Sequence, residues 1–502
     1  MDDAMGALFA FSTAMLPPAA ATQAVAVLVA LVLPSQIGDK GRTALMNRLI
    51  RIGPLMIAAI ALTGTSAGAA EGETNDGGRK LISLTEVAPG LSPVSDYRGD
   101  IMNRSTMIGD PGGHRQALYE RGVMIDIAMT QVVQGIVSGG VEEKAWGYNG
   151  LLDYGIMFDT GKLGLWSGGL LAATAQTSWS DPLTNEVGNL SPVNYTALFP
   201  RPFEPSTELM EYYFIQAFPK EIVVNVGRII PTNFVDRNRF GNDMRNQFLN
   251  TTINNDSLWG YFIKFSTYSA SLAVPLPKGF SFATAIWDPD TEPGDYKGVW
   301  KNIGWFGQLA YKWSVFGDLG GEATFIGVYT NRDAKAIDNP FFPPGEIPDN
   351  APTKPNNWMV HLNIEQYLWK PDDVPGASSH VRTRAFDYQE PGIGLFFRFG
   401  YTPEDRNPWN ITASGGIGAR GVIPGRPYDR MGFGVYSLLA SEELGLDFIP
   451  GDPLVDEVGI EAYYNFAITP WLQVSADIQW VDPGIASNDD AVVLGTRIFT
   501  QF

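Results

Sequence analysis

The segment 231–267 gathers charged side chains of both signs among amides, a set that can hydrogen-bond a polar solute. Its candidates are Asp236, Arg237, Arg239, Asp243, Arg245 and Trp259. Carboxylates accept hydrogen bonds and guanidiniums donate them, so together they match a solute that offers both donors and acceptors. If the segment folds into a channel, these side chains form a polar constriction. If it lies on the surface, they are only solvated, and the sequence leaves both interpretations open.

A second set of charged residues recurs in segments where apolar and polar residues alternate. Alternation places successive side chains on opposite faces of a strand, so we expect this set to share the inner face. It comprises Asp126, Asp153, Glu211, Arg228, Glu365, Arg398, Arg420, Glu461, Asp477 and Arg497. These residues either contact a solute or pair across the wall and only stiffen it.

Catalytic and cofactor signals are weak. The chain has three histidines and no cysteine, which excludes thiolate metal sites and cysteine nucleophiles. No G-x-S-x-G or H-E-x-x-H motif occurs, although an inward-facing His361 keeps an enzyme acting on lipid or envelope polymer as an alternative. Gly416–Gly421 matches G-x-G-x-x-G, but prolines follow where a Rossmann helix should begin. We therefore expect no catalytic residue, no cofactor and no metal site.

Net charge and the front of the chain restrict the class of protein further. A formal charge of −19 argues against a nucleic-acid partner. Residues 46–69 have the basic start, short apolar stretch and small-residue cleavage site of a secretory signal. We interpret 1–45 as an extension from a start assigned too early, with a targeting segment or membrane anchor as the alternative. We expect 70–120 to be a periplasmic segment with a short helix at Gly113–Glu120.

From residue 121 onward, period-two segments predict sixteen strands. They are 123–137, 147–159, 168–180, 208–217, 221–230, 268–275, 280–288, 304–314, 321–330, 357–369, 391–401, 410–421, 430–440, 457–468, 471–481 and 491–502. Short connections such as 469–470 alternate with long ones such as 181–207, 231–267 and 331–356. This pattern is typical of a bacterial outer-membrane barrel with short periplasmic turns and long extracellular loops. The long connection at 370–390, where a short turn is due, does not fit it.

The hairpin 459–481 shows which face we expect to meet lipid. Apolar residues occupy every second position from Ile460 to Ile468 and from Leu472 to Trp480, and polar residues lie between them. A soluble β-protein would bury the apolar face, whereas a transmembrane barrel turns it outward and leaves polar residues in a water-filled lumen. Tryptophans near strand ends and the terminal Phe502 favour the barrel, so we predict an all-β, transmembrane, antiparallel barrel over 121–502, with Phe502 as its assembly signal.

Several stretches of the chain resemble the carbohydrate-selective porins of the OprB type. The resemblance extends over about 110 to 502 and is strongest in EAYYNFAITPW at 461–471, followed by DPG at 482–484 and VLGTR at 493–497. GDPGGHRQALYERG at 109–122 and RGVIPGR at 420–426 also carry it. The central part, 331–390, matches less closely.

The resemblance implies a sixteen-stranded barrel in the bacterial outer membrane that passes small sugars by diffusion. The expected partners are small sugars, outer-membrane lipid, lipopolysaccharide and the barrel assembly machinery, and we expect a monomer rather than a trimer. Three alternatives stay open: a general, trimeric diffusion porin with ion selectivity, a barrel enzyme, and a secreted soluble β-protein.

Overall fold

The computed structural model describes residues 97–183, 185–315, 319–335, 353–371, 390–443, 447–449 and 451–502. All of them belong to one of the chain's two units, Ala69–Phe502. The predicted upstream stretch 1–45, the predicted signal 46–69 and His380 lie outside the described residues, as does 70–96.

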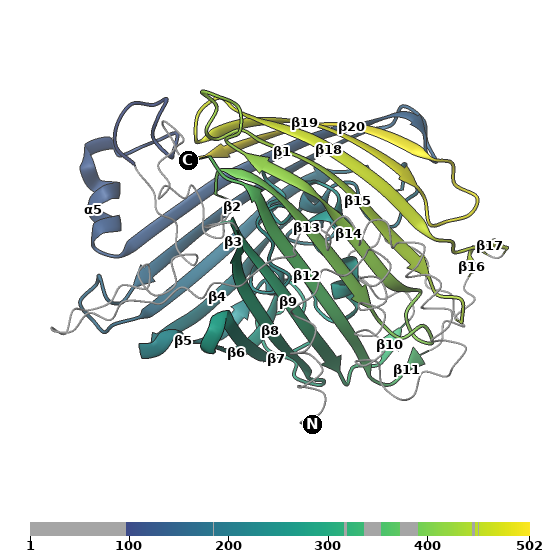
Figure 1. Ribbon diagram of the computed structural model, residues 1–502, viewed down its shortest axis with the longest axis horizontal. Coiled ribbons are helices and arrows are strands. Elements are labelled where there is room, and N and C mark those ends of the chain that lie inside the picture. Colours follow the sequence, from purple (N-terminus) through teal and green to yellow (C-terminus); the bar gives the residue numbers. More distant parts are fainter. Residues whose placement is uncertain are drawn as a thin grey trace. The chain divides into compact units, whose positions relative to one another are not determined.

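Sixteen strands of the described residues close into one antiparallel barrel (Figure 1). They are β1 Val123–Gly139, β2 Trp146–Asp159, β3 Gly169–Asp181, β4 Ser206–Phe218, β5 Ile222–Ile229, β6 Thr267–Pro275, β7 Phe280–Trp287, β8 Gly304–Val315, β9 Leu319–Thr330, β12 Asn357–Trp369, β13 Gly392–Tyr401, β14 Trp409–Arg420, β15 Arg430–Ala440, β18 Glu457–Ala467, β19 Leu472–Asp482 and β20 Ala491–Gln501. Every strand pairs with its neighbour in the chain, and β1 pairs with β20 to close the ring. Each predicted strand is confirmed, with small differences at the ends.

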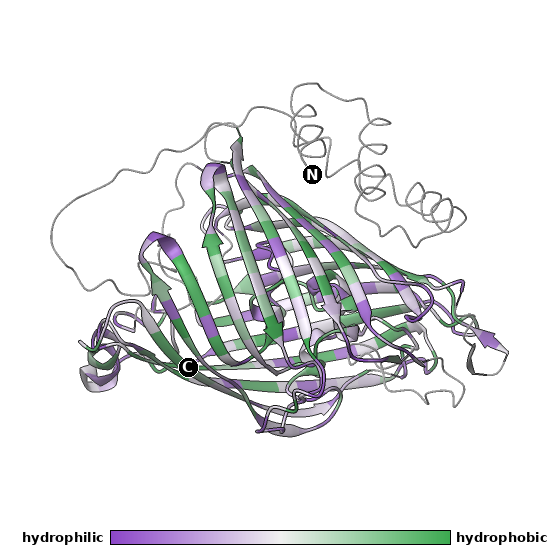
Figure 2. Cartoon of the chain, turned by 90° about the horizontal axis from the view of Figure 1, so that it is seen from below, coloured by the Kyte–Doolittle hydropathy of each residue, from purple (hydrophilic) through white to green (hydrophobic). Residues whose placement is uncertain are grey.

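The strands face as the alternation predicts. On β18 the Glu461 side chain is fully buried toward the interior, whereas the neighbouring Ile460 is exposed on the outside. On β19, Ile478 is 48% exposed and lies between two inward residues, Asp477 and Gln479, that are almost fully buried. Figure 2 shows hydrophobic and hydrophilic residues alternating along the strands. Lipid therefore meets the apolar set, and the polar set is enclosed.

The two ends of the barrel differ in the length of their connections. At one end β4 and β5 are joined by 219–221, β6 and β7 by 276–279, and β18 and β19 by 468–471. At the other end 182–205, 230–266 and 331–356 are much longer. Two small hairpins in the long loops were not predicted, because strands this short leave no period-two pattern. They are β10 Ala334–Lys335 with β11 Thr353–Lys354, and β16 Asp447–Ile449 with β17 Asp452–Pro453.

The helices of the described residues are short and belong to the connections between strands or to the segment before β1. They are α5 His114–Glu120, α6 Thr251–Asn254, and the 3-10 turns Pro111–Gly113, Tyr195–Leu198, Pro219–Glu221, Pro231–Asn233, Ser257–Tyr261 and Pro277–Gly279. Within the described ranges, no helix is both long and apolar enough to span a membrane. Helix α5 coincides with the predicted helical segment and lies beside the seam between β1 and β20 (Figure 1).

Candidate functional site

The connection between β5 and β6, residues 230–266, lies inside the barrel, and we call it the inner loop. Its side chains hydrogen-bond inward residues of β2, β12, β13 and β14, and its backbone is bound by residues of β18 and β20. Phe240, Phe248 and Phe262 in this loop are completely buried. The inner loop is therefore a packed structure attached to several parts of the wall.

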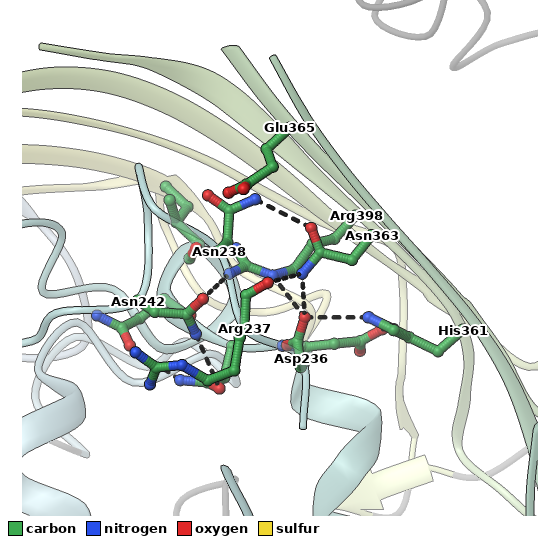
Figure 3. Close-up of polar contacts among 12 residues, drawn as sticks. Asp236, Arg237, Asn238, Asn242, His361, Asn363, Glu365 and Arg398 are labelled. Atoms are coloured by element: carbon green, nitrogen blue, oxygen red, sulfur yellow. Dashed lines mark hydrogen bonds and ion pairs between the residues drawn. The ribbon is translucent and has the colours of Figure 1, made fainter. Parts of the chain in front are cut away.

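Asp236 is the centre of the attachment to β12 and β13 (Figure 3). Its Oδ1 accepts hydrogen bonds from His361 Nε2 at 3.0 Å, Asn363 Nδ2 at 2.8 Å and Arg398 Nε at 2.8 Å. The Asp236 and His361 side chains have no exposed surface. Burial alone would raise the pKa of the Asp236 carboxyl, but the charges of Arg398 and His361 hold this pKa well below its ordinary value.

A second carboxylate of the inner loop, Asp256, completes this attachment. We call the group formed by Asp236, Asp256, His361 and Arg398 the latch. Its Oδ2 lies 2.9 Å from His361 Nδ1, and its Oδ1 accepts a hydrogen bond from Thr412 of β14 at 2.6 Å. Both nitrogens of the His361 ring thus face carboxylate oxygens, and only the imidazolium form can donate from both. The ring is held between two parts of the inner loop and has no open side for a substrate.

Two arginines of the inner loop pair with opposite parts of the wall. Arg239 Nε lies 2.7 Å from Glu365 on β12, and its Nη2 lies 3.8 Å from Glu322 on β9. Arg245 donates to both oxygens of Asp153 on β2, at 2.8 and 2.6 Å. A bidentate pair of this kind fixes orientation as well as distance. The inner loop therefore crosses the lumen between these two walls.

The C-terminal strands hold the middle of the inner loop by its backbone. Glu461 of β18 accepts hydrogen bonds from the amides of Leu249 and Asn250 at 2.6 and 2.8 Å. Arg497 of β20 donates to the carbonyl of Met244 at 2.9 Å. These contacts satisfy backbone groups that would otherwise be buried without partners.

The connection between β3 and β4, residues 182–205, also enters the barrel, and we call it the companion loop. The Glu457 side chain of β18 accepts hydrogen bonds from the backbone amides of Leu190 and Ser191 in this loop, at 2.6 and 2.8 Å. Its Tyr195 amide donates to Leu249 of the inner loop at 2.7 Å. The sequence interpretation missed this inward course. The stretch LSPVNYTALFP at 190–200 carried a signal, because it is too apolar for a loop in water.

A cavity of about 120 Å³, partly open to solvent, lies between the two loops and strands β1–β4. Six of the predicted residues line it: Asp126, Asp153, Glu211, Arg237, Asp243 and Arg245. Tyr195 and Phe199 of the companion loop add aromatic surface, and Gln176 and Asn242 add amides. The cavity thus combines charged, amide and aromatic groups around open space.

The other predicted residues lie elsewhere. Glu365, Arg398, Glu461, Asp477 and Arg497 face inward as predicted, but four of them hold the inner loop, and Asp477 accepts a hydrogen bond from Gln479. Asp236 belongs to the latch, Arg239 pairs with Glu365, and Arg420 faces inward at the end of β14 near the short turns. Phe502 donates its amide to Ile127 of β1 at 2.8 Å.

Two of the predicted positions are wrong. Arg228 has the same parity as the exposed Val226 and lies on the outer face of β5. It is buried there because its guanidinium donates to the carbonyls of Glu292 and Asp295, in the connection between β7 and β8 that covers it. Trp259 is 1% exposed and packs 5.8 Å from the His361 ring, so it offers no surface to a solute. Because Trp259 lies in a connection between strands, its sequence position gave no sign that it is part of the core.

One glycine of the G-x-G-x-x-G match, Gly418 on β14, lies against Phe240 of the inner loop, as does Gly394 on the neighbouring β13. A Cβ on Gly394 would collide with the Phe240 ring, and one on Gly418 would make a tight contact with the Phe240 side chain. These glycines let the loop pack directly on the backbone of the wall. No group of three or more His, Asp or Glu in the described part of the chain could hold a metal ion.

Comparison with known proteins agrees with this architecture. The model of the carbohydrate-selective porin family OprB matches residues 143–502. The high-pH structure of Pseudomonas putida OprB is 18% identical, covering 80% of this chain and 100% of that chain with a TM-score of 0.67. A loop-deletion mutant of OmpT from Vibrio cholerae is 11% identical, covering 75% and 99% with a TM-score of 0.41. At 18% identity the likeness to the Pseudomonas putida structure concerns the fold alone. No curated protein matches significantly.

Proposed function

The chain belongs to the OprB family of carbohydrate-selective porins, and we propose that the cavity beside its inner loop is the constriction through which sugars pass. The protein is a porin of the bacterial outer membrane that lets small carbohydrates diffuse into the periplasm. The long loops are accordingly extracellular and the short turns periplasmic.

One observation carries the proposal: the inner loop spans the lumen and leaves an open space against β1–β4. Arg237, Asn242 and Arg245 supply donors there, and Asp126, Asp153 and Glu211 supply acceptors. Sugar hydroxyls need both. The groups stand around an open space, which fits the weak binding that diffusion requires.

Family and fold are those of channels rather than enzymes. We therefore propose that His361 is structural, since both of its nitrogens are occupied by Asp236 and Asp256. We further propose that the barrel acts as a monomer in outer-membrane lipid and lipopolysaccharide. Phe502, which ends the last strand at the seam, would be the signal read by the barrel assembly machinery.

Single-channel conductance of the refolded protein in a planar bilayer, titrated with glucose, tests the constriction. We expect discrete steps that glucose reduces saturably. Arg237→Ala should raise the half-blocking glucose concentration roughly tenfold, as expected for loss of a hydrogen bond from a charged group. Arg121→Ala, which changes an exposed arginine beyond α5, is the matched control. Conductance steps whose size does not change with glucose concentration would instead favour a general diffusion porin.

A further inference from the structure

The connection between β7 and β8, residues 288–303, lies against the outer face of the barrel, and we call it the outer loop. Arg228, on the outer face of β5, donates hydrogen bonds to two of its carbonyls, including that of Glu292 at 2.6 Å. A Cβ on Gly298 of this loop would lie 3.4 Å from the ring of Tyr268, the cross-strand partner of Arg228 on the same face. The outer loop therefore covers part of the wall that faces the membrane.

Asp288 fixes the backbone of the outer loop. Its fully buried carboxylate accepts hydrogen bonds from the amides of Val299 and Trp300, at 2.6 and 2.7 Å. Trp300 has a φ of 46°, a left-handed conformation that a bulky side chain rarely adopts. Strain of this kind persists only where the surroundings hold it, and it is typical of functional sites. The outer loop thus presents Trp300 from a fixed and strained backbone.

The exposed side of the outer loop is rich in large apolar groups. Four of its side chains are about half exposed: Tyr296, Val299, Trp300 and Ile303. Next to Ile303, the wall continues this surface with Trp305, whose cross-strand partner Ile286 is also exposed on the lipid side. Exposed apolar groups gathered in this way mark an interaction surface rather than a loop in water. Their continuity with the lipid-facing wall indicates that the partner is a membrane lipid.

Two lysines lie among these apolar residues. Lys297 and Lys301 are exposed, and among the described residues neither side chain has a hydrogen bond or an ion pair. The carboxylates of the loop have partners of their own: Asp288 with amides of the loop, Asp290 with Asn302, Glu292 with Lys264, and Asp295 with the amide of Glu292. Asp295 is exposed as well, so the two lysines are distinguished by their place among apolar side chains rather than by net charge.

Lysines beside aromatic residues at the end of a membrane-spanning wall have a known physical use. The aliphatic stem of such a lysine stays against apolar groups, and its ammonium reaches the polar head groups of the lipid. A lipid that satisfies both parts of the outer loop needs acyl chains below and an anionic group above. A phosphorylated lipid of the outer leaflet has both.

We propose that the outer loop is a binding site for the lipid A part of lipopolysaccharide. Tyr296, Trp300 and Ile303 contact the acyl chains, and Lys297 and Lys301 bind the phosphates. Long connections of such a barrel lie on the extracellular side, which is the side of this lipid. The inference rests on the proposed function only in this orientation and does not depend on the constriction.

Binding of fluorescent lipid A to the refolded protein in detergent, followed by anisotropy, tests the site. Lys297→Gln combined with Lys301→Gln should weaken binding by roughly 25-fold, or about fivefold for each basic side chain near an anionic surface. Dephosphorylated lipid A should bind the unmodified protein and this double variant equally weakly. Lys220→Gln combined with Lys278→Gln makes the same change at exposed periplasmic turns and should leave both affinities unchanged.

Trp300→Ala gives a second measurement, because it removes apolar contact and should weaken binding of both lipid forms alike. Equal binding of lipid A by the unmodified protein and the double lysine variant of the outer loop would overturn the proposal. Displacement of lipid A by excess inorganic phosphate would overturn it in favour of a site for a free anion. Variants that dissociate an oligomer without changing lipid A binding would assign the outer loop to a second copy of the chain.

Block of the conductance by glucose separates this inference from the sugar pathway. The outer-loop variants should leave the block unchanged, since the loop lies outside the wall. Glucose block without lipid A binding would refute the lipid site alone, and lipid A binding without glucose block would refute the sugar constriction alone.

Discussion

At the residue scale, the attachment of the inner loop depends on a few fully buried charges. Asp236, His361 and Arg398 form a network in which each charge has a partner within 3.0 Å. Such networks are costly to break, because removing one partner leaves another charge buried and uncompensated. The network therefore holds one conformation of the inner loop rather than adding much to the stability of the barrel.

Asp236→Asn should loosen the inner loop. Three donors now converge on one carboxylate oxygen, and the neutral amide cannot compensate Arg398 and His361. We expect the latch to lose roughly 3–5 kcal/mol and the channel to show a higher, noisier conductance. Asp405→Asn, which removes partly exposed pairs with Lys354 and Arg406 in an extracellular loop, should cost about 1 kcal/mol or less. Equal, quiet currents from both variants would contradict the role of Asp236.

The same carboxylate predicts how the latch responds to acid. The folded-state pKa of Asp236 is depressed, so its contribution is fully present above the ordinary pKa of about 3.9 and is lost only as pH falls toward the folded value. Hydrogen exchange of residues 231–266 should therefore show constant protection, corrected for intrinsic rates, between pH 7 and pH 4.5. Loss of protection near pH 6 would assign the latch to another group.

At the element scale, each strand is defined by which face meets lipid. Ile478 lies in the middle of β19, where it pairs with Ala462 and Leu494. Ile468 is similarly exposed but lies in the periplasmic turn after β18. The two isoleucines share chemistry and orientation and differ in depth.

Ile478→Lys should destabilise the barrel by roughly 2–4 kcal/mol, and Ile468→Lys by about 0–1 kcal/mol. The reason is that a charge is most costly at the centre of the hydrocarbon layer, where water and head groups are farthest away. Urea unfolding in lipid vesicles, followed by tryptophan fluorescence, measures both. Equal destabilisation would mean that the depth assigned to β19 is wrong.

The N-terminal helix has a role at the seam of the barrel. Arg115 of α5 donates to the carbonyl of Ile125 on β1 at 3.1 Å and to that of Phe502 at 2.9 Å. It thus bridges the first and last strands. Arg115→Ala should lower the temperature at which the folded barrel unfolds in detergent, with Arg121→Ala as control. Unchanged heat resistance would show that backbone pairing of β1 with β20 suffices for closure.

At the scale of the whole molecule, the wall and its contents are separate structures. The wall is closed by backbone pairing around the ring, whereas the inner loop is joined to it mainly by side chains. A closed ring has no free edge and satisfies its backbone in lipid without help from the lumen. The inner loop can therefore determine selectivity without determining the fold.

Replacing residues 234–262 by a short Gly/Ser linker should leave a folded barrel with a larger pore. The charged groups that now bind the inner loop would meet water in the lumen, which can solvate them. We expect conductance to increase severalfold and block by glucose to disappear, while resistance to unfolding in detergent persists. A variant that fails to close would show that the inner loop is needed for assembly.

The sequence by itself determined the wall. Alternation with period two is a local pattern, and it indicated all sixteen strands, the lipid-facing set around Ile478 and the inward position of Glu461 and Arg398. It also made 231–267 a candidate for a loop inside the lumen, through charges such as Asp236 and Arg245, but left a surface position open. At Arg228 the parity of the strand agrees with an outward position, and only the structure shows that a loop covers the side chain there.

Only the tertiary structure decided which charged residues hold the inner loop and which line the cavity. Asp236 and Asp243 are alike in sequence, yet one is buried between His361 and Arg398 and the other lines the open cavity. The sequence interpretation did not place the companion loop in the lumen or Trp259 in the core, where the structure shows them. The physical reason is that pairing across the lumen joins residues far apart in the chain, and no local pattern records which wall a loop will meet.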